Sequence, residues 1–596
     1  MTNKTATLLA IALIAFTGIM ATASIINDSL TMDELAHLPA GYSYLTQKDM
    51  RLNPEHPPLI KDLSAFPLLF IRNIRFPYEI KSWTQDINGQ WDFGNHFLFK
   101  TGNPAEKMIF WSRIPMILLL MVLGIYVFLF AKNLFGKKAG LLALFFYSFS
   151  PTLLAHGRLV TTDVGAAAGV FISTYYFIKF LKKSSLKNLV LAGVFLGLAE
   201  LAKFSLVLLI PFFALITVIW ILLKSTSFRE FLKTFGFYFV RCLMIIVIGY
   251  VLVWGVYQYH TFGYPPERQK ADTEFLLSSF GNRPLANAVV WMSDKPVLRP
   301  AAQYTLGLFM VLQRASGGNT GYFLGEVSAA GWKYYFPVVY FIKEPLAFHI
   351  LSLVAGLYVL WVMLKRKPSI KGLKEKIYLG VKAHFPEIAM LLFINIYWIT
   401  SMRSNLNIGV RHLLPIFPFA VLLLSGGLTA WLKPPILKIK TVFLVILMLW
   451  QAYSVISVYP HFIAYFNELA GGPENGYKWV VDSNLDWGQD LKRLKIWLDK
   501  NNVDKIYLDY FGGSDTNYYL KEKYSPWWGD RNPNEIPEGS YLAVSATLLQ
   551  GGTGKAAPGF DSPTGYYNWL IENYRPIDRI GYSIFIFKID PLNAID

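Results

Sequence analysis

Long apolar runs recur along this sequence, separated by short charged connections. A helix needs about 20 mainly apolar residues to cross a bilayer. We assign about eleven spans on that basis, near 6–26, 111–131, 139–156, 164–180, 188–201, 205–223, 242–258, 335–364, 388–402, 413–432 and 441–459. Only 16% of the residues are charged, whereas a soluble domain carries about 25%. The sequence therefore predicts an all-α polytopic membrane domain.

The first apolar run ends in Ala21-Thr22-Ala23, which resembles the small-residue site at which signal peptides are cleaved. Its length of about 20 residues suits a membrane span better than the apolar region of a signal peptide, which is about 7 to 15 residues long. We therefore expect this run to be retained as the first span.

Lysine-rich connections alternate with connections that carry few lysines. Lys132 and Lys137 lie in the first of them, and others lie at 179–187, 224–233, 365–382 and 433–440. Cytoplasmic loops carry an excess of Lys and Arg. We therefore expect a cytoplasmic N-terminus and an extracytoplasmic C-terminal segment. The outer connections would be 27–110, 259–334 and the short turns 156–163, 201–205 and 403–412.

The net charge of +17 does not indicate nucleic-acid binding. That function needs basic residues gathered on one water-exposed face, and here they lie between apolar runs. Cys242 is the single cysteine, so the chain can form neither an internal disulfide nor a cysteine zinc cluster.

Hydrophobicity falls after Pro460, and the pattern becomes that of a water-soluble α/β domain. Leu491, Leu494 and Leu498 share one helical face. Residues 505–511, 541–546 and 582–589 are typical of β-strands. We therefore divide the chain into a membrane domain, 1–459, and an extracytoplasmic domain, 460–596.

The first outer loop is dense in polar side chains that follow directly on the first span. Asp33, Glu34 and His37 come first. Tandem prolines then force a turn that presents Glu55 and His56, with Lys61 behind them. Such a group could bind a metal or an anion, or perform acid–base chemistry. Alternatively, the acids could simply cap the next helix.

Charged residues recur in the other outer connections. Charges this close to hydrocarbon are costly and usually serve a site. A local ion pair for the Lys343-Glu344 couple, and snorkelling of Arg403 to the lipid headgroups, are the alternatives. The remaining candidates are Arg158, Asp163, Glu200, Lys203, Arg411 and His412. Carboxylates and cations at one face of the membrane suit a reaction between a lipid-borne phosphate and a polar acceptor.

These residues resemble the GT-C superfamily of glycosyltransferases, which use polyprenyl-phosphate sugars. The superfamily includes the protein O-mannosyltransferases of family 39 and the lipid A aminoarabinose transferase. The similar pieces are Asp33-Glu34, Pro57-Pro58-Leu59, Gly157-Arg158 with Asp163, Gly197-Leu198-Ala199 with Lys203-Phe204, and Arg411-His412-Leu413-Leu414-Pro415. The stretches 465–468 and 482–488 are similar to a bacterial branch of the group.

The resemblance implies that Asp33 acts as the general base or orients the acceptor, with Glu34 supporting it and Asp163 as a second acid. His56 stands where the aminoarabinose transferase has a lysine thought to hold the lipid phosphate. His56, if protonated, is thus one candidate for that contact. The alternative cations are Lys61, Arg158, Lys203, Lys343 and Arg411. Asp33, Glu34 and Asp163 could also hold a divalent cation, Mg or Mn.

We therefore expect a glycosyltransferase of the bacterial plasma membrane. It would move a sugar, with inversion, from a polyprenyl phosphate to an acceptor protein, lipid or glycan. No nucleotide-sugar site is expected, because the inner connections lack a phosphate-binding glycine loop. The rival functions are a transporter or flippase of a lipid-linked sugar, which should place its charges near the bilayer midplane, and an assembly factor that performs no chemistry.

Overall fold

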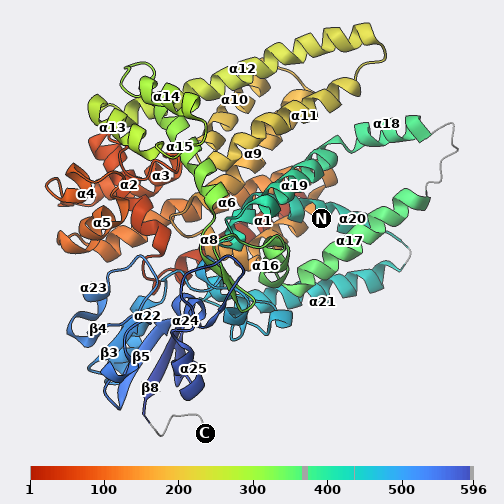
Figure 1. Ribbon diagram of the computed structural model, residues 1–596. Helices are drawn as coiled ribbons and strands as arrows, with labels where there is room; N and C mark the ends of the chain where they lie inside the picture. Colours follow the sequence, from red (N-terminus) through yellow and green to blue (C-terminus); the bar gives the residue numbers. More distant parts are fainter. Residues whose placement is uncertain (1, 366–372, 435, 591–596) are drawn as a thin grey trace.

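The computed structural model describes residues 2–365, 373–434 and 436–590. Within these residues, nine helices are long and apolar enough to cross a membrane, so the protein is an integral membrane protein (Figure 1). They are α1 (Asn3–Ser24), α6 (Ala105–Phe135), α9 (Thr162–Lys182), η3–α11 (Phe204–Leu222), α12 (Phe228–His260), α17 (Leu346–Lys365), α19 (Phe385–Arg403), η5–α20 (Val410–Trp431) and α21 (Leu437–Ile456).

The two other predicted spans are helices of the bundle, but they are short. The run 139–156 is divided into α7 (Lys137–Ser148) and α8 (Pro151–His156), because Ser150 caps a new helix that starts with proline. The run 188–201 is α10 (Leu186–Glu200), of 15 residues, which packs between α9 and α12. In the part of the chain that the structure describes, the count by length is therefore nine rather than eleven.

A proline also divides the predicted span 335–364. The backbone leaves helical geometry at Glu344, which precedes Pro345. The result is a short helix, α16 (Tyr335–Lys343), followed by the spanning helix α17. Lys343 and Glu344 consequently lie at a helix break instead of inside a continuous span.

Figure 1 shows two distinct ends of the bundle. One end, here called the site end, carries α2 (Met32–Gln47), α3 (Leu59–Ala65), α4 (Lys81–Thr84), α5 (Gln90–Asn95), α13 (Pro266–Leu276), α14 (Arg283–Met292), α15 (Arg299–Gly317) and the C-terminal domain. The opposite end carries α18 (Leu373–Ala383) and the connection between α11 and α12. Both long connections predicted to be outer are thus gathered at one end.

The C-terminal domain is built on a five-stranded sheet in the order β4-β3-β5-β8-β7. Its strands are β3 (Ile506–Asp509), β4 (Tyr524–Pro526), β5 (Ser540–Ser545), β7 (Asp578–Ile580) and β8 (Ile584–Ile589). β3 and β8 lie within strand segments predicted from the sequence, and β5 begins one residue before the third predicted segment. The adjoining helix α22 (Leu491–Lys500) buries Leu491, Leu494 and Leu498, which confirms its predicted apolar face.

Two features join this domain to the membrane part. The hairpin β1 (Gly321–Phe323) and β2 (Glu326–Ser328) pairs with β6 (Lys555–Ala556) in a second, small sheet. Farther along the chain, the N–H of Ser29 donates to the carbonyl of Gln489 at 2.9 Å and that of Met32 to Trp487 at 3.1 Å. The C-terminal domain therefore rests on the start of α2, where Asp33 lies.

Candidate active site

Arg411 lies at the centre of a cluster of charged side chains at the site end. Its Nη1 donates to Oδ2 of Asp33 at 2.7 Å and to Oδ2 of Asp163 at 3.3 Å. Lys203 Nζ donates to the other oxygen of Asp163, Oδ1, at 2.6 Å. The fold thus brings together four of the residues proposed from the sequence, although they come from four separate segments.

Helix ends position each member of this cluster. Asp33 is the second residue of α2 and Asp163 the second of α9, where a helix favours negative charge. Lys203 is the N-cap residue of η3, and Arg411 lies in the first turn of η5. The functional groups therefore gather at the mouths of the helices and not along their middles.

The two acids differ in accessibility. The side chain of Asp33 is 23% exposed, whereas that of Asp163 is fully buried between Lys203 and Arg411. Asp163 holds the two cations in place, and Asp33 is the carboxylate that a second molecule can reach.

Glu34 points away from this cluster. It is fully buried and forms a capping box with Thr31 at the start of α2. It also pairs with Arg113, whose Nε donates at 2.8 Å, and accepts the N–H of Val160 at 2.9 Å. With these partners Glu34 stabilises the loop that carries Asp33, as the capping alternative anticipated.

Lys61 is buried and saturated with hydrogen bonds. Its ammonium donates to the carbonyls of Asn53 and His56 at 2.8 and 2.7 Å and to the Tyr44 hydroxyl at 2.8 Å. Burial lowers the pKa of Lys61 to about 7. The side chain secures the tandem-proline turn instead of facing a ligand.

Arg158 belongs to a second buried group of charges. Its Nη1 lies 2.6 Å from Asp28, which also pairs with Arg493 of the C-terminal domain at 2.6 Å. Arg493 pairs in turn with Asp490 at 2.6 Å. These ion pairs connect three segments: the first loop, helix α22 and the turn that follows α8. Arg158 is therefore already paired with a carboxylate.

Lys343 is likewise engaged by the backbone. Its Nζ donates to the carbonyls of Ile463, Tyr465 and Asn484 at 2.8, 2.6 and 2.6 Å. Three carbonyls match the three N–H bonds of an ammonium group. The residue fixes the segment that follows α21, and this role differs from both alternatives considered for it.

The first-loop histidines lie side by side, with ring centroids 5.0 Å apart. Nδ1 of His37 contacts the Val160 carbonyl at 2.9 Å. Burial, together with the neighbouring His37 and Lys61, holds the pKa of His56 well below its ordinary value. A neutral imidazole is a poor phosphate ligand, so the fold does not favour His56 for that contact. Glu55 accepts hydrogen bonds from Asn88 and Gln90 instead.

His412 follows Arg411 directly. Its carbonyl accepts a hydrogen bond from the Tyr397 hydroxyl at 2.9 Å. Its Nε2 has no hydrogen-bond partner among the described residues. The ring lies next to the cluster, with its Nε2 buried and unpaired.

The C-terminal domain supplies residues that the motifs did not single out as functional. Ser483 Oγ accepts from Arg411 Nε at 3.1 Å, and the Trp487 ring lies 4.2 Å from the guanidinium carbon. Gly409 permits this approach, because a Cβ there would lie 2.2 Å from Ser483 Oγ. Asp482 is partly buried beside Arg411, and burial raises its pKa to about 6. The Asp-Ser-Asn-Leu-Asp-Trp-Gly stretch was the only sequence signal for these residues.

Asp486, from the same stretch, does not cap α22. Its Oδ2 accepts the N–H of Thr547 at 2.8 Å, at the start of α24 (Ala546–Thr553). The N-cap residue of α22 is Asp490. Asp486 therefore accepts a backbone N–H in the first turn of α24 and not one of α22.

The three carboxylates considered for a metal do not converge. Asp33 and Asp163 share the Arg411 guanidinium, whereas Glu34 pairs with Arg113. Across residues 2–365, 373–434 and 436–590, no group of three His, Cys, Asp or Glu side chains could hold a metal ion. These residues do not fit a carboxylate-bound Mg or Mn, and cations already neutralise the site.

Comparisons with known proteins relate the membrane part to one family. Residues 105–254 match the family described as dolichyl-phosphate-mannose-protein mannosyltransferase. A search of curated proteins finds no match.

Solved structures with a similar course of the chain include ArnT from Cupriavidus metallidurans bound to undecaprenyl phosphate (11% identity, 98% of this chain, 99% of that one, TM-score 0.47). Another is the apo Archaeoglobus fulgidus oligosaccharyltransferase (12% identity, 90% of this chain, 69% of that one, TM-score 0.46). A third is the protein O-mannosyltransferase complex Pmt1-Pmt2 of S. cerevisiae (17% identity, 44% of this chain, 34% of that one, TM-score 0.35). The match thus spans about a third of that yeast chain.

The matched residues include α6, α9, α10 and most of α12, and with them Asp163 and Lys203 of the charged cluster. The segment of the chain that is similar to this mannosyltransferase family therefore contains two members of the charged cluster.

Proposed function

We propose that the protein transfers a sugar from a polyprenyl-phosphate carrier to an acceptor hydroxyl on the extracytoplasmic side of a bacterial plasma membrane. The acceptor oxygen attacks the anomeric carbon from the face opposite the phosphate, which inverts the configuration. As the new C–O bond forms, the bond to the phosphate oxygen breaks and its electron pair leaves with the lipid phosphate. Asp33 receives the hydroxyl proton.

One observation carries this proposal. Asp33 is a partly exposed carboxylate held by Arg411. Arg411 also pairs with Asp163, which in turn pairs with Lys203. A base must reach the acceptor proton, and cations must lie where negative charge accumulates on the leaving group. The cluster offers both within a few ångströms.

The family description supports the donor class, since it names a mannose carried on dolichyl phosphate. The position of the charges supports an enzyme over a transporter, because they occupy helix ends at one face rather than the middles of spans. The sidedness follows the positive-inside rule: α18 and the α11–α12 connection, which belong to the lysine-rich set, lie at the end opposite α2 (Figure 1).

Among the described residues, we consider three cations for the lipid phosphate. Lys203 and Arg411 are already in the cluster. Arg314, in the last turn of α15, is exposed and has no hydrogen bond or ion pair among the described residues. Its charge nevertheless contributes to the low pKa of His56. Arg314 is therefore a further candidate for the donor phosphate.

The test is turnover by Asp33→Asn in vesicles supplied with a radiolabelled polyprenyl-phosphate sugar and a mixture of envelope acceptors. We expect a loss of about 10²- to 10⁴-fold, the usual contribution of a general base. Binding of the lipid phosphate should persist, because Arg411 and Lys203 remain. Glu79→Gln, an exposed carboxylate of the same loop, is the matched control. Near-normal transfer by Asp33→Asn would disprove the role of this residue.

A further inference from the structure

The helical hairpin of α14 and α15 presents an apolar surface that packs against nothing else in the described chain. Leu285, Ala288 and Trp291 are exposed at spacings of three residues along α14, and they form one stripe. Its opposite side buries Ala286 and Val289 against α15. A helix that is apolar on both sides belongs in a protein core or in contact with lipid.

The position of this hairpin relative to a spanning helix indicates which of the two applies. The indole of Trp254 donates to the carbonyl of Val297, in the turn between α14 and α15, at 2.9 Å. Trp254 precedes the end of α12 at His260 by six residues, or about 9 Å along a helix. The turn therefore lies beside α12 about 9 Å before the end of that helix, toward the membrane interior, where we expect α12 to border lipid.

The exposed side chains at this level continue the lipid-facing surface of α12. Val297 is 69% exposed and Trp291 58% exposed, and Val251 on α12 is 60% exposed. Tryptophan is enriched where membranes meet water, and lysine and arginine extend their charges to the headgroups from there. Lys295 lies beside the stripe, with its Nζ 5.9 Å from the centroid of the Trp291 ring.

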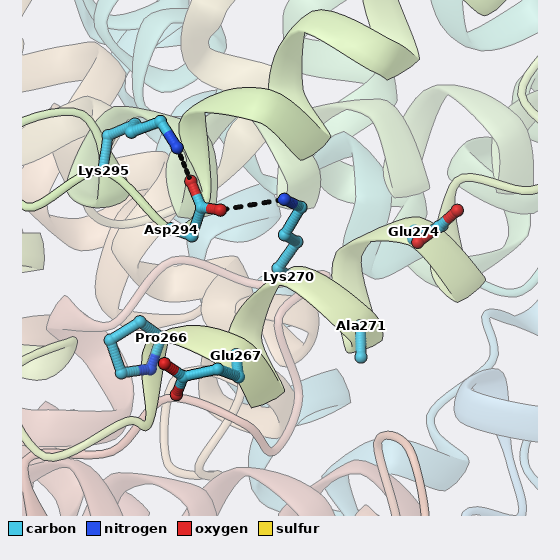
Figure 2. A pocket seen from close by; sticks show the side chains of 7 residues that line it. All are labelled: Pro266, Glu267, Lys270, Ala271, Glu274, Asp294 and Lys295. Atoms are coloured by element: carbon cyan, nitrogen blue, oxygen red, sulfur yellow. Dashed lines mark hydrogen bonds and ion pairs between the residues drawn. The ribbon is translucent and has the colours of Figure 1, made fainter.

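The other side of the hairpin is polar. Figure 2 shows a hollow between α13 and the α14–α15 turn, in which Lys270 and Lys295 both contact Asp294, at 2.9 and 2.6 Å. Glu267 and Ala271 also line this hollow. The hairpin is thus amphipathic as a unit, with a charged face and an apolar face.

We propose that α14 and the α14–α15 turn lie in the headgroup region of the bilayer, with Leu285, Ala288, Trp291 and Val297 inserted among the lipids. With 10 residues, α14 is too short to cross a membrane, so it lies along the surface. α15 then runs from this lipid-bound turn toward the site, since a Cβ at Gly307 would meet the Pro54 carbonyl at 2.3 Å. The occupant of the apolar face is lipid and not a protein.

Spin labels on single cysteines test this in vesicles, in a Cys242→Ala background. Labels at Ala288→Cys and Val297→Cys should collide more often with oxygen than with a water-soluble nickel chelate, as a label at Val251→Cys does. Labels at Glu538→Cys, in the C-terminal domain, and at Ala271→Cys, in the hollow, should show the reverse.

Three results would overturn the proposal. Labels at 288 and 297 could show the same collision rates as the label at 538, which would indicate that the stripe faces water. They could be shielded from both reagents, which means a covering protein segment. They could also show dipolar broadening between labels at 288 that disappears on dilution with unlabelled protein, which means a second copy of the chain. None of these readouts requires sugar transfer, so failure of the proposed reaction would leave the test intact.

Discussion

The backbone carbonyl of Trp487 accepts a hydrogen bond from the N–H of Met32 at 3.1 Å. Met32 precedes the proposed base, Asp33, and the Trp487 ring covers the arginine that holds it. The C-terminal domain therefore contacts the start of α2 next to Asp33 and covers Arg411.

Widening this contact should slow the reaction without unfolding the protein. A Cβ at Gly513 would lie 2.5 Å from the carbonyl of Thr31, so Gly513→Ala pushes the domain away from the start of α2. A misplacement of about 1 Å costs on the order of 10²-fold in rate. We expect kcat to fall by about 10- to 100-fold, with unchanged binding of the lipid phosphate. Gly551→Ala, whose Cβ meets only a hydroxyl at 3.7 Å, is the control. Equal rates for the two variants would contradict this coupling.

Asp482 should contribute to turnover only when it is ionised. Burial raises its pKa to about 6, so at pH 5 it is mostly protonated and at pH 8 it is a carboxylate beside Arg411. Asp482→Asn should equal the wild type in kcat at pH 5 and fall about 10-fold below it at pH 8. Asp33→Asn should be impaired at both values. A pH-independent ratio between Asp482→Asn and wild type would rule out this role.

Lys343 should contribute to the stability of the fold and not to binding of the donor phosphate. Lys343→Met leaves the carbonyls of Ile463, Tyr465 and Asn484 without their donor. Each buried acceptor left unpaired costs about 1 to 3 kcal/mol, so we expect a loss of about 3 kcal/mol or more. Thermal unfolding in detergent micelles measures it, with exposed Lys333→Met as the control. Normal stability combined with weak binding of lipid phosphate would instead assign Lys343 to the donor.

Asp486 should make stability depend on pH. Burial raises its folded-state pKa to about 8, whereas an unfolded aspartate titrates near 3.9. Between these values the folded state binds more protons than the unfolded state, so stability falls as pH rises from about 4 to about 8. Asp486→Asn mimics the protonated acid and should lack this component. The difference in Tm between variant and wild type should therefore grow in favour of the variant from pH 5 to pH 8, and a constant difference would refute the assignment.

The sequence predicted the bundle and the gathering of the two long connections at one end, and it named Asp33, Asp163, Lys203 and Arg411 among the charged residues expected there. These features depend on apolar length, on the alternation of lysines and on charges at helix ends, all of which are local. It could not separate Lys203 from Lys343, because both are lone lysines near the end of an apolar run. Only the carbonyls of residues more than a hundred positions away distinguish them.

The same limit explains why no role was predicted for Asp482 and why the break within the predicted span 139–156 was missed. The contact of residue 482 with the Arg411 cluster depends on Gly409 and on the course of the C-terminal domain, neither of which has a periodic pattern. Ser150 divides the predicted span 139–156 into α7, of 12 residues, and α8, whereas α10, of 15 residues, covers nearly the positions of the predicted span 188–201. Hydropathy measures apolar length and cannot show where a helix ends.

The pairing of β6 with β2 has a consequence for biosynthesis. The strand partner of residues 326–328 is made more than two hundred residues later, at Lys555 and Ala556. Ser483 and Trp487, which surround Arg411, are also translated after every spanning helix in the described chain. A nascent or prematurely terminated chain thus inserts its helices before Ser483 and Trp487 can complete the surroundings of Arg411.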